Sequence, residues 1–196
     1  MNFDCNKTYT PENDAVLLKP LEEADNEYLL PFAISKPEIW KYSMFSAAGI
    51  QGLKNYLANA IFLRNNGKDY PFLIFNKRSG QYAGSIRFYD NEPVSNTIHL
   101  DFTWYGKKFQ VTGLNRHCKF LMLQFVFEVI GVLRVDADSR NQRSIAAMKS
   151  IGCNVEGKLR SNGYTTDGSR RDPTIPRILR HEWDESIKSN LFLKLV

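Results

Sequence analysis

The chain has 196 residues, of which 43% are hydrophobic and 24% are charged, and its formal net charge is +5. These values are typical of a globular protein with one sizeable core, and they exclude a disordered chain or two ordinary domains. The positive charges are spread along the sequence, and no basic run alternates with aromatic residues. Nucleic-acid binding is therefore not indicated.

The three cysteines, Cys5, Cys118 and Cys153, are far apart and lack the paired spacing of a disulfide framework or a zinc site. Cys118 and Cys153 fall in apolar stretches, so we predict that both are small buried hydrophobic residues. The first residues lack the layout of a signal peptide, and no apolar run approaches membrane-spanning length. We expect a cytoplasmic protein with no metal site and no membrane partner.

The first part of the chain reads as a strand followed by helices. Acidic residues gather at the start of the first helix, where the helix dipole favours them. In the longer helix Ile50, Leu53, Leu57 and Ile61 recur at helical spacing and are predicted to face the core. The predicted elements are a strand at 15–20, a helix at 21–32, a short helix or turn at 36–42 and a helix at 46–65 that ends before Gly67.

The hydrophobic period then changes to that of strands, which predicts an antiparallel meander. A strongly apolar helix follows, and after it strands and helices alternate. This order predicts an α/β fold with a mixed sheet and helices on both faces, formed by residues 1–196 as a single domain. The predicted strands are 71–76, 82–89, 97–104, 133–138, 153–159 and 175–182, and the predicted helices are 114–130, 141–151 and 184–195.

A basic loop with a glycine joins the strand that ends at Trp104 to the helix that starts near Gly113. The first N–H groups of a helix have no partners inside the helix, and together with the helix dipole they form a site for an anion such as phosphate. Glycine at 113 would let a phosphate approach the backbone closely. The loop is neither a Walker loop nor a dinucleotide fingerprint, so the motif alone is weak.

A second junction of strand and helix carries Asn141 and, one turn later, Ser144. Either Asn141 or Ser139 is expected to cap the helix. Ser144 lies on roughly the same side of the helix as Asn141 and faces the strand end. Two such junctions predict a ligand that lies between two neighbouring strands.

Taken together, these motifs resemble the GNAT N-acetyltransferases, and more closely the Rim-type branch that acetylates N-termini of ribosomal proteins. The matching order and spacing cover most of residues 97–183, about half of the chain, whereas the N-terminal half matches only in outline. The matching stretches are QVTGLN at 110–115, Asp138-x-x-Asn141-x-x-Ser144, Ile151-Gly152, Glu156-Gly157-x-Leu159-Arg160, Asp167-Gly168-x-x-Arg171-Asp172 and Glu182-Trp183.

The resemblance implies a mixed, mostly antiparallel twisted sheet with a splayed central strand pair. Acetyl-CoA, the implied co-substrate, would lie in that V-shaped cleft, with its pyrophosphate on the backbone of residues 111–115 and its pantetheine arm along the splayed strand. The residues implied for CoA binding are Phe102, Thr103, Trp104, Gln110, Val111, Thr112, Gly113, Leu114, Asn115 and Asn141.

The resemblance also implies the catalytic groups. Asn141 would contact the pantetheine arm, and Ser144 would protonate or stabilise the leaving thiolate. His99 aligns with a position that is often glutamate in this branch, and it would act as a base or orient a water; the competing interpretation is a half-buried strand residue. The chain departs from the family pattern at several places. Val111 replaces a frequent glycine, the 134–141 segment is shorter than usual, and Gly163 stands near the place of a catalytic glutamate. His117 and Cys118 also replace a frequent glutamate and alanine.

We therefore expect an acetyl-CoA-dependent N-acetyltransferase that acts on a primary amine, either a protein N-terminus or a small amine, with a homodimer as one possible assembly. The alternative is a catalytically weak or inactive GNAT-like module that binds acyl-CoA for regulation. Val111 and the missing glutamate favour that alternative, and Asn141 and Ser144 oppose it.

Overall fold

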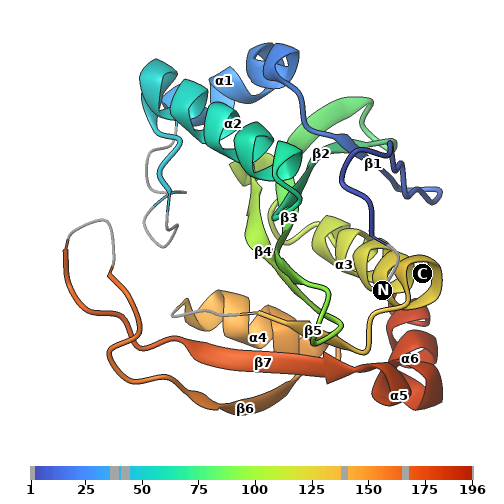
Figure 1. Ribbon diagram of the computed structural model, residues 1–196. Helices are drawn as coiled ribbons and strands as arrows, with labels where there is room; N and C mark the ends of the chain where they lie inside the picture. The colour runs from blue at the N-terminus through green and yellow to red at the C-terminus, as the bar shows by residue number, and fades with distance from the viewer. Residues whose placement is uncertain (1–2, 36–39, 41–44, 138–140, 165–167, 196) are drawn as a thin grey trace.

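The computed structural model of the chain describes residues 3–35, 40, 45–137, 141–164 and 168–195. Within them, seven strands form one sheet in the order β1-β2-β3-β4-β5-β7-β6 (Figure 1). Every neighbouring pair is antiparallel except β4 and β5, so the predicted mixed, mostly antiparallel sheet is confirmed. The strands are β1 (Val16–Pro20), β2 (Tyr70–Asn76), β3 (Gln81–Glu92), β4 (Thr97–Tyr105), β5 (Arg134–Asp136), β6 (Asn154–Lys158) and β7 (Thr174–Leu179).

Helices cover both faces of the sheet, as predicted. Side chains of a strand alternate between faces, and on β2 Phe72 belongs to the core under α3 whereas Leu73 belongs to the core under α1 and α2. The helical elements are α1 (Asn26–Ser35), α2 (Gly49–Asn65), α3 (Leu114–Gln124) with a π-helical turn (Phe125–Ile130), α4 (Gln142–Ser150), α5 (Arg180–Glu182) with a π-helical turn (Trp183–Ile187), and α6 (Lys188–Phe192).

Three sequence expectations need correction or fall outside the described residues. Ile50 was expected in the core but is 56% exposed, because it lies in the first turn of α2, whereas Leu53 and Leu57 are buried. The last predicted strand ends at Leu179 instead of residue 182, because a backbone N–H of Leu179 bonds to the Glu182 carboxylate and a helix starts there. The short element predicted at 36–42 lies outside the described residues, apart from the buried Trp40.

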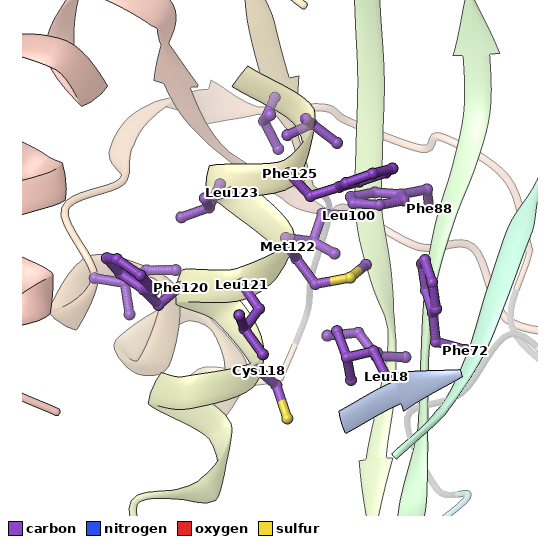
Figure 2. Packing of buried hydrophobic residues seen from close by; sticks show 14 of the residues in the cluster. Leu18, Phe72, Phe88, Leu100, Cys118, Phe120, Leu121, Met122, Leu123 and Phe125 are labelled. Atoms are coloured by element: carbon purple, nitrogen blue, oxygen red, sulfur yellow. The ribbon is translucent and has the colours of Figure 1, made fainter. Parts of the chain in front are cut away.

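The larger core lies between α3 and the sheet, where Figure 2 shows Met122 and Phe125 pointing toward Phe72 and Phe88. The rings of Phe88 and Phe125 stack with their centroids 6.2 Å apart. Burying each such side chain contributes about 1.5–3 kcal/mol. This packing fixes α3 against the middle of the sheet, and so fixes the position of the loop that precedes the helix.

All three cysteines are buried and free, as predicted for Cys118 and Cys153. Burial raises the pKa of Cys5 to about 11 and the pKa of Cys118 and of Cys153 to about 12. All three thiols are therefore protonated near neutral pH, and they serve as small apolar side chains.

The central strands β4 and β5 separate after a short parallel contact. Their pairing consists of three residue pairs and stops at His99 and Asp136 among the residues that the structure describes. One step further along β4, the register with β3 shifts, and Phe102 has a φ of 51°, which marks a β-bulge. The bulge bends the second half of β4 away from β5. The splayed strand pair is therefore confirmed.

Candidate active site

A cavity of about 710 Å³ opens where β4 and β5 diverge. This volume lies within the range of small-molecule sites. Its walls come from the splayed half of β4, the loop before α3, the first half of α3, and α4. Its lining includes Asp101, Thr103, Trp104, Tyr105, Lys107, Gln110, Val111, Gly113, Asn115, Arg116, Lys119, Asn141, Arg143, Ser144, Ala147 and Met148.

The loop before α3 presents its backbone to the cavity. Gly113 precedes the helix with a φ of 82° and no side-chain cap, so the first N–H groups of α3 stay available to a ligand. A Cβ added at Gly113 would meet no atom within 4 Å, so the space in front of it is open. Val111 also has a positive φ, 61°, although it is β-branched, and it is almost fully exposed. Such a conformation is strained for valine.

Cationic side chains line the same end of the cavity. Lys107, Arg116 and Arg143 come from three different elements and are exposed. The Arg143 guanidinium donates a hydrogen bond to the Gln110 side chain at 3.5 Å, which links α4 to the loop across the cavity. Three cations beside the start of a helix suit a ligand with several phosphate groups.

The junction between β5 and α4 places Asn141 and Ser144 together on the cavity wall. Asn141 is the N-cap of α4, and its Oδ1 accepts a hydrogen bond from the Arg143 backbone N–H at 3.0 Å. The capping expected of Asn141 or Ser139 therefore belongs to Asn141, while Ser139 lies outside the described residues. Capping uses one face of the Asn141 amide, and Ser144, one turn further on, is half-buried in the cavity wall.

A buried lysine in the cavity wall was missed by the sequence reasoning. Lys119 lies in α3 one turn after Asn115, is 4% exposed, and its Nζ donates a hydrogen bond to Thr103 Oγ1 on β4 at 3.0 Å. Burial lowers the pKa of Lys119, and the nearby Asp101 charge opposes that change. The available signal was a single charge between the apolar residues Cys118 and Phe120.

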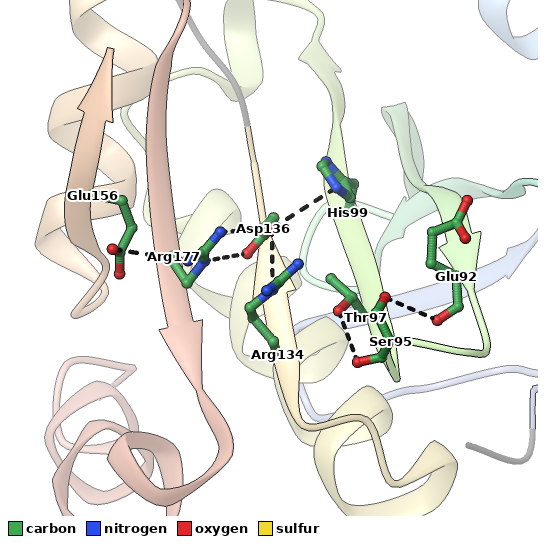
Figure 3. Close-up of polar contacts among 8 residues, drawn as sticks. All are labelled: Glu92, Ser95, Thr97, His99, Arg134, Asp136, Glu156 and Arg177. Carbon is green, nitrogen blue, oxygen red and sulfur yellow. Dashed lines mark hydrogen bonds and ion pairs between the residues drawn. The ribbon is translucent and has the colours of Figure 1, made fainter. Parts of the chain in front are cut away.

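His99 occupies the last rung of the parallel pair instead of the cavity wall. Its Nε2 lies 3.9 Å from Asp136 Oδ2 (Figure 3). Its ring packs against Tyr89, with the ring centroids 5.0 Å apart. Its Nδ1 is buried and has no hydrogen-bond partner among the residues that the structure describes. Asp101 lies two residues further along β4, and of these two side chains Asp101 lines the cavity whereas His99 does not.

Asp136, which pairs with His99 in the parallel register of β4 and β5, is in contact with several positively charged side chains (Figure 3). It is 4% exposed and accepts two hydrogen bonds from the Arg177 guanidinium, at 2.7 and 3.2 Å. Arg134 Nε lies 3.2 Å from the same carboxylate. The hydrogen bond to Asp136 is the largest cause that raises the pKa of Arg177. The network ties β5 to β7 and to β4 below the cavity.

Three other predicted CoA-binding residues do not line the cavity with their side chains. Phe102 lies over the Arg87 guanidinium at 4.5 Å, among residues of the α2 side. Leu114 is buried in the core under α3, and the Thr112 hydroxyl donates to the Phe109 carbonyl at 2.8 Å. Any contact of Thr112 or Leu114 with a ligand in the cavity would use the backbone.

Two absences bear on the chemistry. Within the described ranges, no group of three histidine, cysteine or acidic side chains could hold a metal ion. No helix in that part of the chain is both long and apolar enough to cross a membrane.

The strand order, the single parallel pair and its splay define the GNAT fold. The sequence agrees with the fold, because residues 15–154 match the family described as acetyltransferase (GNAT) domain. The chain therefore belongs to the GNAT acetyltransferase family.

Solved structures of this fold match nearly the whole chain. A GCN5-related N-acetyltransferase from Brucella melitensis superposes with a TM-score of 0.88 at 21% identity, covering 98% of this chain and 88% of its own. RimJ of Mycobacterium smegmatis, in complex with CoA-disulfide, gives 0.77 at 17% identity, covering 95% and 91%. The microcin C7 self-immunity acetyltransferase MccE, in complex with acetyl-CoA and AMP, gives 0.75 at 19% identity, covering 85% and 93%. No curated protein sequence matches the chain.

Proposed function

We propose that this protein transfers an acetyl group from acetyl-CoA to a primary amine. The observation that carries the proposal is the cavity at the β4–β5 splay, which combines open backbone N–H groups, three exposed cations and a serine hydroxyl. Family membership supports it, as do the related structures of MccE with acetyl-CoA and of RimJ with CoA-disulfide.

The residues present fit the two chemical parts of acetyl-CoA. The phosphates suit the N–H groups of residues 111–115 with Lys107, Arg116 and Arg143. The pantetheine arm suits the splayed half of β4, around Phe102–Trp104, whose backbone has no partner on β5 among the described residues. Asn141 lines the cavity at the start of α4, and we propose that its side chain contacts that arm.

The transfer needs no covalent intermediate with the enzyme. The neutral amine nitrogen attacks the thioester carbonyl, the N–C bond forms, and the C–S bond breaks with its electron pair left on sulfur. Backbone N–H groups of the splayed β4 stabilise the oxyanion. The Ser144 hydroxyl donates a hydrogen bond or a proton to the sulfur, and a base accepts the proton of the attacking amine.

His99 is the proposed base, acting directly or through a water molecule. It is partly exposed at the bottom of the splay, and its buried Nδ1 lacks a hydrogen-bond partner within the described residues. An imidazole nitrogen can accept a proton, which suits a base for an amine that must react in its neutral form. The rings of His99 and Phe102 both contact Tyr89, so we place the acceptor on that side of the sheet, opposite α3.

The proposed acceptor is a protein N-terminus or a small amine. RimJ-type structures favour the former by analogy only. A second candidate function, an acyl-CoA-binding module without turnover, is favoured by the strained Val111 in the phosphate loop and by glycine at 163.

The deciding experiment has two steps. Acetyl-CoA is titrated into the protein by calorimetry, and thiol release is then followed with a panel of peptides with free N-termini, amino acids and polyamines. Binding with turnover above the amine-free rate supports the transferase. Binding without turnover on any amine would favour the binding module, and no binding would refute both.

A further inference from the structure

We propose that the Lys119 ammonium is a second catalytic group, which stabilises the CoA thiolate as it leaves. This inference rests on the proposed function and adds a residue that acts on the sulfur together with Ser144. Both side chains line the same cavity, Lys119 from α3 and Ser144 from α4.

The first argument is the incomplete pairing of Lys119. A lysine is almost never fully buried unless it is paired, and this one is 4% exposed with one neutral partner, the Thr103 hydroxyl. No carboxylate lies within 4.0 Å of its Nζ among the residues that the structure describes. A buried cation with a single hydroxyl partner is unfavourable for stability alone. An anion that enters the cavity would complete its pairing.

The second argument is its place along the cavity. Lys107, Arg116 and Arg143 are exposed and lie beside the phosphate loop, whereas Lys119 is buried and reaches Thr103 on the splayed half of β4. Phosphates carry permanent charge and suit the exposed cations. Two parts of the ligand become negative during the reaction: the carbonyl oxygen, which the backbone N–H groups of β4 stabilise, and the sulfur, to which we assign Lys119.

The groups whose charges act on Lys119 are one acid and two thiols. They are Asp101 on β4, Cys118 on α3 and Cys153 at the start of β6. Both thiols are protonated near neutral pH, because burial raises the pKa of each to about 12. Asp101 is thus the one anion among these three groups, and its charge favours the ammonium form of Lys119.

The expected effect is electrostatic. When the C–S bond breaks, the electron pair stays on sulfur, and a cation within a few ångströms lowers the pKa of the thiol by about 1–3 units. A serine hydroxyl supplies one neutral hydrogen bond, whereas Lys119 supplies a charge, which acts in a site with little water. Lys119 keeps its proton in this step, and the amine proton goes to the base.

The test measures the pKa of the CoA thiol bound to the protein, with no acceptor needed. Thiolate absorbance in the ultraviolet is followed against pH as the difference between complexes with CoA and with desulfo-CoA. We expect the bound thiol in the native protein to titrate at least about one unit below free CoA. In Lys119→Met the bound thiol should titrate at or above free CoA, and in Lys119→Arg, which keeps the charge, below it. Methionine fills the same volume, and calorimetric binding of desulfo-CoA checks that each variant keeps its cleft.

The experiment distinguishes failure of the proposed function from failure of the role proposed for Lys119. If the native protein binds neither CoA nor desulfo-CoA, the proposed function falls and the role of Lys119 falls with it. If CoA binds but its thiol titrates equally in the native protein and in Lys119→Met, only the role of Lys119 is overturned. Acetylation of Lys119 itself, detected by intact mass after incubation with acetyl-CoA, would also overturn it, because the residue would then be an acceptor.

Discussion

The buried charges near the two ends of β4 differ in how completely they are paired. At the end paired with β5, the Asp136 carboxylate is surrounded by Arg177, Arg134 and His99. At the splayed end, the Lys119 ammonium has one neutral hydroxyl, on Thr103, and faces a cavity. A charge with a full set of partners holds the fold together, whereas a charge with an incomplete set is available to a ligand.

The comparison predicts that substitutions at the splayed end change binding and chemistry, and that substitutions at the paired end change stability. Ser144→Ala, Gly113→Val and Asp136→Asn test this division, in order of decreasing expected effect, and Val111→Gly then tests the backbone strain in the phosphate loop. If a substitution at the splayed end changed only stability, or one at the paired end changed only binding or turnover, the number of partners of a polar group would not tell its structural role from its functional role in this sheet.

Ser144→Ala should lower the rate of acetyl transfer about 100-fold, because an active-site hydrogen-bond donor that stabilises developing charge contributes roughly that much. Its affinity for CoA and its melting temperature should stay near those of the native protein. Single-turnover thiol release and calorimetry measure the two quantities. Undiminished turnover would remove Ser144 from the mechanism.

Gly113→Val should weaken CoA binding about 30-fold, because valine at a φ of 82° strains the loop and covers the open space in front of the helix. Gly80→Val is the matched control. Gly80 also has a positive φ, 65°, and open space around a Cβ, but it lies in the turn between β2 and β3. Both variants should lose about 1–2 kcal/mol of stability, and only Gly113→Val should lose affinity. Equal affinities would place the phosphates elsewhere.

Asp136→Asn should lower the free energy of unfolding by about 1.5 kcal/mol, because it removes the negative charge and one of the two oxygens that accept hydrogen bonds from Arg177 at a buried position. Urea unfolding measures this change. The control is Asp172→Asn, which alters an exposed pair with Lys158 and should cost much less stability, because exposed ion pairs contribute little. If the two variants lose the same stability, the network around Asp136 contributes no more to the free energy of unfolding than an exposed ion pair does.

Val111→Gly should raise stability by about 0.5 kcal/mol, because the relief of a positive φ at a β-branched residue exceeds the entropy that glycine adds to the unfolded chain. Val111 is 97% exposed, so little packing is lost. A rise of about 1–2 °C in melting temperature is expected. A lower melting temperature would mean that valine is not strained at this position.

The sequence predicted the fold well because most elements carry strong periodic signals. The meander of β2, β3 and β4 and the apolar helix α3 follow directly from hydrophobic spacing, and the ordered motifs between residues 110 and 157 placed the two junctions beside each other. The prediction that Ile50 faces the core was wrong, because helical spacing does not tell which end of a helix projects beyond the sheet.

The site was only partly predictable, for a physical reason. Gly113, Asn141 and Ser144 belong to local junctions that can be read in the chain, and the structure places them on one cavity. The orientation of Lys119 depends on its contact with Thr103, which is 16 residues away in the sequence. The position of His99 relative to the cavity depends on where the pairing of β4 with β5 ends. Such positions are set by tertiary packing and by the bulge at Phe102, and neither has a local signature.

The splay also has a consequence for solubility. A strand with unsatisfied backbone groups normally recruits strands from other molecules and promotes aggregation. Here the side of β4 that has no strand partner among the described residues faces the cavity between α3 and α4, so that another polypeptide strand with its side chains would have to enter that cavity to reach it. A narrow, unbranched ligand can enter the cavity without meeting this restriction. The gap between β4 and β5 therefore favours narrow ligands over a polypeptide strand.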